Sequence, residues 1–178
     1  MKLNIFQKIW MLFSVLVLAS CGTSDMIRPS QKIGPMWVNR YGHTTAEGIW
    51  EHCDGSMTEA PGTLTTDCTI PWVDELFIGH GLYGVDAAQR EALWNATTWE
   101  LFIDGHAVDL PAFNIADFDA TQDGVTYQYR VWRIRLREIP EGLHTLRYVM
   151  HVNQEVDGVF DAQSIGAYEL IVNFTFGD

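Results

Sequence analysis

The residues from Tyr129 to Val152 constrain the fold of this 178-residue chain more than any other stretch. They form two runs in which apolar and polar residues alternate, joined by Ile139-Pro140-Glu141-Gly142. Successive side chains of a strand point to opposite faces, so each run has one apolar and one polar face. Pro140 has a fixed φ and Gly142 tolerates positive φ, which predicts a turn. The pattern predicts a central hairpin that needs a larger sheet, because an isolated hairpin is only marginally stable.

Further alternating or β-rich runs, separated by turn residues, extend this pattern along the chain. Asp104-Gly105 is a dipeptide typical of hairpin turns. The expected additional strands cover residues 35–41, 48–53, 63–73, 99–103, 106–110 and 167–176. Short strands spaced by turn signals favour an antiparallel β-sandwich.

One helix is expected within this series of strands. Asp86 precedes the segment Ala87 to Asn95, and its carboxylate can accept from the free amides of a first helical turn. The residues around Pro111 to Ala120 are predicted to form a loop.

Three segments together resemble bacterial immunoglobulin-like domains. They are T-W-E-L-F-I-D-G-H-A-V, W-R-I-R-L-R-E-I-P-E-G-L-H-T-L-R-Y-V and Y-E-L-I-V-N-F-T-F, between Thr98 and Phe176. The resemblance implies an immunoglobulin-like sandwich and, loosely, surface adhesion or a modular architecture. The chain departs from the family in its long segment Pro35 to Asn95 and in Asn153 to Asp157, where a D-x-x-G-N pattern is usual. We therefore expect an all-β, immunoglobulin-like antiparallel sandwich over 35–178, with an N-terminal elaboration (35–97) that contains one short helix.

The start of the chain has the features of an export signal. Lys2 and Lys8 precede the apolar run Ile9 to Ala19, which is too short to span a bilayer. The run ends in Leu-Ala-Ser-Cys21, which resembles the lipobox of bacterial lipoproteins. The resemblance implies a signal peptide over 1–20, acylation of Cys21, a tether over 21–34 and attachment to the bacterial cell envelope on its extracytoplasmic side. The alternative is a soluble secreted protein in which Cys21 is incidental.

Composition agrees with a folded domain outside the cell. Hydrophobic residues make up 47% of the chain and charged residues 19%, so a sizeable core can form. The net charge of −12 becomes still more negative when the two lysines of the leader are removed. An acidic chain repels nucleic acid and anionic lipid surfaces, which leaves basic or neutral ligands, including glycans and divalent cations.

The two cysteines that remain after Cys21 are expected to pair. Cys53 and Cys68 would close a loop of about fifteen residues in an oxidising compartment. The alternative is a metal site using His52 and Cys53, but no C-x-x-C or H-x-x-x-H spacing supports it.

His144 is interpreted as a structural corner residue. Immunoglobulin-like sandwiches often place a tyrosine at this corner, and an imidazole can likewise bond back to upstream backbone. The other histidines are scattered without the spacing of metal ligands.

Asp117, Asp119, Thr121 and Asp123 are the candidate residues for calcium. Alternating oxygen-bearing side chains that end in a glycine, here Gly124, can wrap a hard cation. The position where a bidentate glutamate is expected holds Arg130, and a polar Asp-Gly turn explains the same residues. Apart from this candidate, we expect no cofactor.

Aromatic residues suggest a second kind of binding. The tryptophans beyond the leader are Trp37, Trp50, Trp72, Trp94, Trp99 and Trp132, and tyrosines occur at 83, 127 and 129. They can serve as a platform for sugar rings, although most suit a core equally well.

No nucleophile elbow, H-E-x-x-H motif or phosphate loop is present, and no catalytic residue is assigned. The expected function is a non-catalytic binding or structural module of the envelope that contacts a glycan or an envelope protein. The alternatives are a carbohydrate-binding module and an envelope hydrolase with paired carboxylates.

Overall fold

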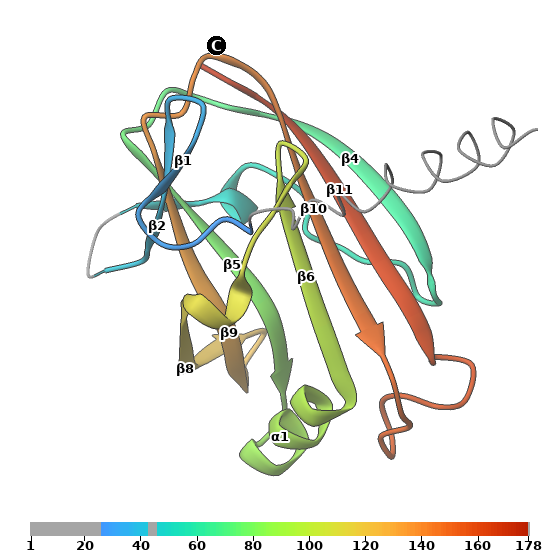
Figure 1. Ribbon diagram of the computed structural model, residues 1–178. Helices are drawn as coiled ribbons and strands as arrows, with labels where there is room; N and C mark the ends of the chain where they lie inside the picture. The colour runs from blue at the N-terminus through green and yellow to red at the C-terminus, as the bar shows by residue number, and fades with distance from the viewer. Residues whose placement is uncertain (1–25, 43–45, 178) are drawn as a thin grey trace, which may run out of the picture.

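The computed structural model describes residues 26–42 and 46–177, which form two facing β-sheets and one α-helix (Figure 1). The first sheet has the order β1 (Gln31–Ile33), β2 (Met36–Arg40), β9 (Val125–Arg137), β5 (Glu75–Gly84) and β3 (Glu47–Gly48), and β8 (Asn114–Gln122) also pairs with β9. The second has the order β4 (Gly62–Ile70), β11 (Gly166–Phe176), β10 (Gly142–Val152), β6 (Thr97–Ile103) and β7 (His106–Ala107). The expected all-β sandwich with one short helix is confirmed.

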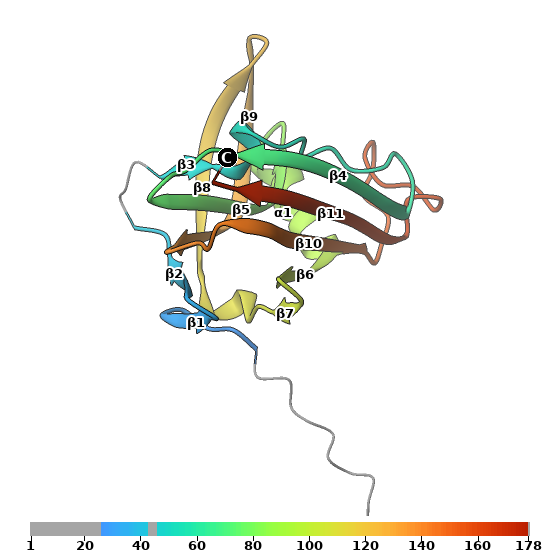
Figure 2. The same cartoon turned by 90° about the horizontal axis from the view of Figure 1, so that it is seen from above.

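Most neighbouring strands are antiparallel, but β3 pairs with β5 and β4 pairs with β11 in parallel. The longest strand, β9, pairs with β5 along one edge. Its other edge is shared, because β2 pairs with residues 134–137 and β8 with residues 125–133. Figure 2 shows the outer part of the β8–β9 hairpin extending beyond the sandwich.

The prediction that the two runs of 129–152 form a hairpin is wrong. The runs are β9 and β10, and they belong to opposite sheets. Positive φ values at Glu138 (52°) and Gly142 (123°) turn the chain across the sandwich, and Ile139 is buried in the core on the way. The alternation was interpreted correctly, since Ile134 and Leu136 on β9 and Leu146 and Tyr148 on β10 are all buried.

The core is one cluster between the sheets. Its largest fully buried side chains are Tyr148, Phe174, Phe176, Met36, Ile49, Ile70, Leu76, Ile78, Leu101, Ile103, Ile134 and Leu136. Burying an aliphatic or aromatic side chain of this size stabilises a fold by about 1.5–3 kcal/mol. The alternating stripes therefore hold the two sheets together.

The segment 35–97 is built into the sandwich, because β2 and β5 flank β9 and β4 pairs with β11. The helix α1 (Ala87–Ala96) follows β5 and lies at the end of the sandwich opposite the C-terminus (Figure 1). As expected, Asp86 caps it, and the side chain accepts a hydrogen bond from the Gln89 amide at 2.8 Å.

Two expected strands end early and are followed by 3₁₀ helices. Of residues 48–53, only Gly48 is in a strand, and a 3₁₀ helix (η2, Ile49–Glu51) follows because the Glu51 carboxylate accepts from the Gly48 amide at 2.8 Å. The strand 106–110 ends at Ala107, and a second 3₁₀ helix (η3, Leu110–Ala112) begins with Pro111 in its first turn.

The predicted loop around 111–120 is instead largely strand. Most of it belongs to β8, an edge strand. Its residues are largely exposed and do not form an apolar stripe, so the sequence pattern does not indicate a strand.

The N-terminal predictions fall partly within the structure. The expected leader and Cys21 lie outside the described residues. Part of the expected tether joins the fold, because Ile27 bridges Val108 and β1 pairs with β2. In the described ranges, no helix is long and apolar enough to span a membrane.

The predicted disulfide between Cys53 and Cys68 is present, and it closes a loop of sequence separation 15. Constraining a loop of this length in the unfolded chain contributes about 3 kcal/mol to the free energy of unfolding.

We expect the Cys53→Ala/Cys68→Ala variant to lose about that much free energy of unfolding, measured by urea denaturation. A loss below about 1 kcal/mol would show that the bridge does not constrain the unfolded state.

Candidate functional site

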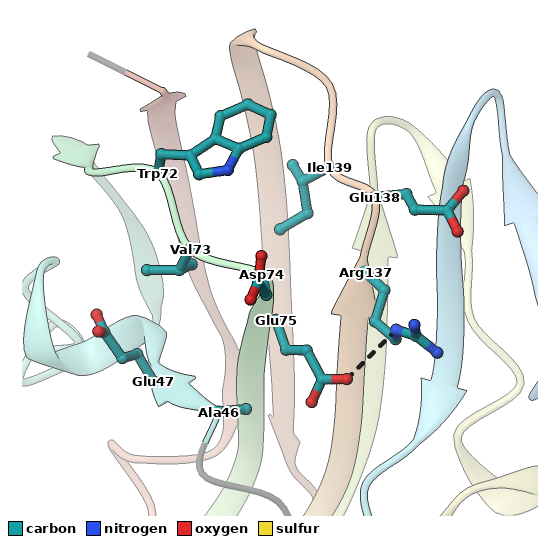
Figure 3. A pocket seen from close by; sticks show the side chains of 9 residues that line it. All are labelled: Ala46, Glu47, Trp72, Val73, Asp74, Glu75, Arg137, Glu138 and Ile139. Atoms are coloured by element: carbon teal, nitrogen blue, oxygen red, sulfur yellow. Dashed lines mark ion pairs between the residues drawn. The ribbon is translucent and has the colours of Figure 1, made fainter.

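A large pocket lies at the end of the sandwich opposite α1, where the β4–β5 connection, the end of β9 and the residues around β3 meet (Figure 3). Its volume is about 760 Å³, within the usual range for ligand sites. It is lined by Ala46, Glu47, Trp72, Val73, Asp74, Glu75, Arg137, Glu138 and Ile139. We call it the Trp72 pocket.

Trp72 provides an exposed aromatic surface at this pocket. It follows β4, where Pro71 cannot extend a strand ladder, and its side chain is 65% exposed. The indole packs on Phe176, the last residue of β11, with ring centroids 5.3 Å apart. Figure 3 shows the ring at the rim of the pocket, on the same connection as Val73 and Asp74. One side of the indole is therefore supported by the core while much of the ring remains open to solvent.

The polar groups of the Trp72 pocket are four carboxylates and one guanidinium. Glu75 Oε1 lies 3.3 Å from Arg137 Nε, the ion pair drawn in Figure 3. Glu138 Oε2 lies 3.6 Å from Lys32 Nζ, and Glu47 Oε2 lies 2.9 Å from His52 Nε2.

Asp74 differs from these groups, because it makes no hydrogen bond or ion pair with any described residue. The pocket thus offers carboxylate acceptors, the N–H donors of Arg137 and an apolar ring face. This combination suits a neutral polyhydroxylated ligand.

The remaining tryptophans are placed differently. Trp94, Trp99 and Trp132 pack against one another inside the sandwich, with centroid distances of 4.5–6.1 Å. Trp37 lies under the ammonium of Lys32, 4.5 Å from its ring centroid. Trp50 is 38% exposed and lies beside β5. Of the six, Trp72 has the largest exposed fraction.

The structure brings the three tyrosines together. Tyr83 lies 5.0 Å from Tyr127 and 5.1 Å from Tyr129, and Phe118 joins them 5.2 Å from Tyr129. Phe118 lies on β8, in the segment predicted as a loop, so it is not among the aromatic residues that the sequence offers for binding. The rings of Phe118 and Tyr129 are stacked on each other with planes only 5° apart, and Tyr83 stands at 69° to Tyr127. The cluster therefore uses its ring faces internally and does not form one coplanar platform.

The candidate calcium residues are not gathered around one point. They lie along β8 and its turn, where an extended strand advances about 3.3 Å per residue. Both carboxylate oxygens of Asp117 accept from Arg130 at 2.8 Å, which holds the pKa of Asp117 below its ordinary value. Thr121 Oγ1 bonds Thr126 Oγ1 at 3.0 Å, and Asp123 has a turn φ of 52°. Among the described residues, no group of three His, Cys, Asp or Glu side chains could hold a metal ion.

His144 ties two turns together. One ring nitrogen lies 2.8 Å from Asp104 Oδ2 and the other 2.8 Å from the Pro140 carbonyl oxygen. Two acceptors favour the doubly protonated imidazole, and the bond to Asp104 raises the pKa of His144 despite its burial. Burial acts to raise the pKa of Asp104, but bonds from His144 and the Thr145 amide outweigh it and hold the value low. The bond from His144 to the Pro140 carbonyl oxygen is the contact with upstream backbone that a structural corner residue is expected to make.

Comparisons with known proteins give no family. No protein-family model and no curated protein matches the chain. Among solved structures, a chain from "Structure of PbICP-C in complex with falcipain-2" aligns with a TM-score of 0.36 and 14% identity, over 75% of this chain and 99% of that one. A likeness at this level supports no conclusion about function.

The His144–Asp104 pair predicts a pH-dependent stability. Since the pKa of His144 is raised, its contribution is complete below the unfolded value of about 6.5 and is lost as pH rises through the folded value. We expect the free energy of unfolding to fall by on the order of 1 kcal/mol between about pH 5.5 and pH 9, measured by urea denaturation.

The His144→Gln variant should lose this step, whereas His151→Gln, which removes a more exposed imidazole, should keep it. Asp104 affects stability at acid pH. Because its pKa is lowered in the folded protein, its contribution to the free energy of unfolding is lost as pH falls through that folded-state pKa. An unchanged pH profile in His144→Gln would show that the pair does not stabilise the corner.

Proposed function

We propose that this chain is an exported, lipid-anchored protein of the bacterial cell envelope that binds carbohydrate, without catalysis, in the Trp72 pocket. Export and anchoring rest on the apolar leader and the Leu-Ala-Ser-Cys21 sequence. The Cys53–Cys68 disulfide supports this assignment, since disulfides persist in oxidising compartments.

The observation that carries the binding proposal is an indole, 65% exposed, beside carboxylates in a pocket of about 760 Å³. A sugar ring has an apolar face that packs on an indole, and its hydroxyl groups donate to carboxylate oxygens around the edge. Asp74 is the acceptor without an internal partner, while Arg137 is held by Glu75 and keeps donors for a ring or hydroxyl oxygen. Recognition of this kind needs no net charge on the ligand.

The pocket favours recognition of a short glycan or a chain end. Trp72 is one isolated exposed indole in a recess, and the tyrosine cluster on β5 and β9 lacks the coplanar faces that a long glycan platform needs. A recess of this volume, lined by residues from three parts of the chain, suits a short glycan or the end of a longer one.

Binding is tested by calorimetric titration with neutral trisaccharides, using chitotriose, cellotriose and maltotriose. We expect at least one to bind, and Trp72→Ala to weaken that binding at least about tenfold, which corresponds to 1.4 kcal/mol. Asp74→Asn should weaken it to a smaller degree, because the side chain keeps its size and one acceptor oxygen.

The matched control is Tyr83→Ala, which removes an aromatic side chain 52% exposed outside the Trp72 pocket. If Tyr83→Ala weakens trisaccharide binding and Trp72→Ala does not, the glycan binds at the tyrosine cluster and not in the Trp72 pocket. Cleavage of a trisaccharide during the titration would show that the protein is a hydrolase and would contradict the non-catalytic proposal.

The anchoring proposal predicts acylation at Cys21. In a bacterial host fed an alkyne-labelled palmitate, the chain should carry the label and sediment with membranes. The Cys21→Ser variant should lose both properties. A wild-type chain released without label would favour ordinary secretion.

A further inference from the structure

The hairpin of β8 and β9 leaves one long strand edge unpaired. β8 has nine residues and, among the described strands, pairs with β9 only. Its outer part extends beyond the sandwich together with residues 125–127 of β9, which lie past the last β5 pair, Gly84 with Gln128 (Figure 2). In an antiparallel ladder, about every second residue directs its backbone N–H and C=O away from the partner strand. The outer edge of β8 therefore presents a row of backbone donors and acceptors that no described strand satisfies.

β8 lacks most of the features by which proteins block an edge of this kind. Edge strands are usually short or protected by lysine, proline or a bulge, because an open edge can pair with another chain. The sequence of β8, N-I-A-D-F-D-A-T-Q, contains neither lysine nor proline. Its register with β9 runs without a bulge from Asn114 to Gln122. Its only charged residues are Asp117 and Asp119, so the edge is open and its acids influence which strand can pair with it.

One face of β8 offers an apolar surface beside this edge. Ala116, Phe118 and Ala120 lie on the same face as Tyr127 and Tyr129, because directly paired residues of two strands share a face. Phe118 is 45% exposed, and one side of its ring stacks on Tyr129. An apolar side chain on an added strand would pack against Phe118 and the small alanines that flank it.

The opposite face of β8 is acidic. Arg130 and Arg90 both pair with Asp117, and Arg130 also pairs with Glu91. In this group two carboxylates meet two guanidiniums, so their charges balance. The carboxylate of Asp119 makes no hydrogen bond or ion pair with any described residue, which leaves a negative charge beside the edge. A basic side chain on an added strand would form a favourable cross-strand pair with it.

Charge distinguishes between the possible occupants of the edge. A second copy of this chain would bring another Asp117 and Asp119 against the first pair, and the net charge of −12 adds to the repulsion. A segment that alternates apolar residues with lysine or arginine matches both faces of β8 at once, because successive side chains of a strand point to opposite faces.

We propose that β8 is the docking edge for an extended segment of another protein, in which apolar residues alternate with lysine or arginine. The segment adds a strand to the first sheet. Backbone hydrogen bonds along β8 supply affinity, while Phe118 and Asp119 select the sequence. β8 contributes no residue to the Trp72 pocket, so this docking does not depend on carbohydrate binding.

The proposal is tested with a fluorescein-labelled peptide, K-V-K-V-K-V-K-V-K, titrated with the purified full-length protein and followed by fluorescence anisotropy at about 150 mM salt, where long-range attraction between exposed charges is screened. We expect saturable binding with a Kd below about 100 μM. The peptide with glutamate in place of lysine should bind at least about tenfold more weakly. The peptide with proline in place of valine keeps the charge but cannot form a full strand ladder, and it should be weakened as much.

Asp119→Lys reverses the charge beside the edge. We expect it to weaken binding of the lysine peptide at least about fivefold and to strengthen binding of the glutamate peptide. Phe118→Ala should weaken both several-fold at a nearly unchanged melting temperature, because the ring is about half exposed. The matched control is Asp67→Lys, which makes the same charge change on β4, an edge strand of the second sheet, and should leave both affinities unchanged.

Absence of saturable binding of the lysine peptide up to about 1 mM protein would overturn the proposal. Equal binding of the proline peptide would show attraction by charge without strand addition, and equal weakening by Asp119→Lys and Asp67→Lys would show that β8 is not the site; either result would overturn it. A wild-type dimer in sedimentation experiments that Phe118→Ala dissociates would mean that a second copy occupies the edge, which would also overturn it.

Discussion

The apolar faces of β9 and β10 must be buried, and the molecule buries them by placing the two strands in opposite sheets. Each strand is amphipathic, so each needs neighbours on both edges and an apolar layer across from it. β5, β2 and β8 supply the edges of β9, and β11 and β6 supply those of β10. The crossing at residues 138–142, with Ile139 in the core, makes the two apolar stripes face one interior.

The Trp72 pocket follows from this arrangement. The crossing brings Arg137 and Glu138 to one end of the sandwich, beside Trp72 on the connection from the second sheet to the first. The His144–Asp104 pair holds the crossing in place by bonding the Pro140 carbonyl.

Alternation in the sequence was sufficient to locate most strands and their buried faces, because side-chain direction has a period of two residues. It does not specify which strand pairs with which, so the short link with Pro140 and Gly142 was interpreted as a hairpin turn. The predicted strands do not include β5 or β8. β5 contains three glycines, which weaken a strand pattern, and β8 is an edge strand outside the core that needs no apolar stripe. The Cys53–Cys68 pair followed from counting cysteines, and the Asp86 cap from its position before a helical segment.

The sites were harder to predict, because their residues are distant in sequence. Glu47, Trp72 and Glu138 become neighbours only through the topology of both sheets. The alternating patterns assign Trp99 and Trp132 to apolar faces, but nothing in the sequence singles out Trp72 among the other four tryptophans.

Backbone nuclear Overhauser effects test the central claim most directly, since they report which strands are neighbours. Placement of β9 and β10 in opposite sheets predicts Hα and amide contacts from β9 to β5, including Ile134 with Ile78, and from β10 to β11 and β6. Backbone contacts between β9 and β10 in an antiparallel register would show a hairpin within one sheet and would contradict this placement.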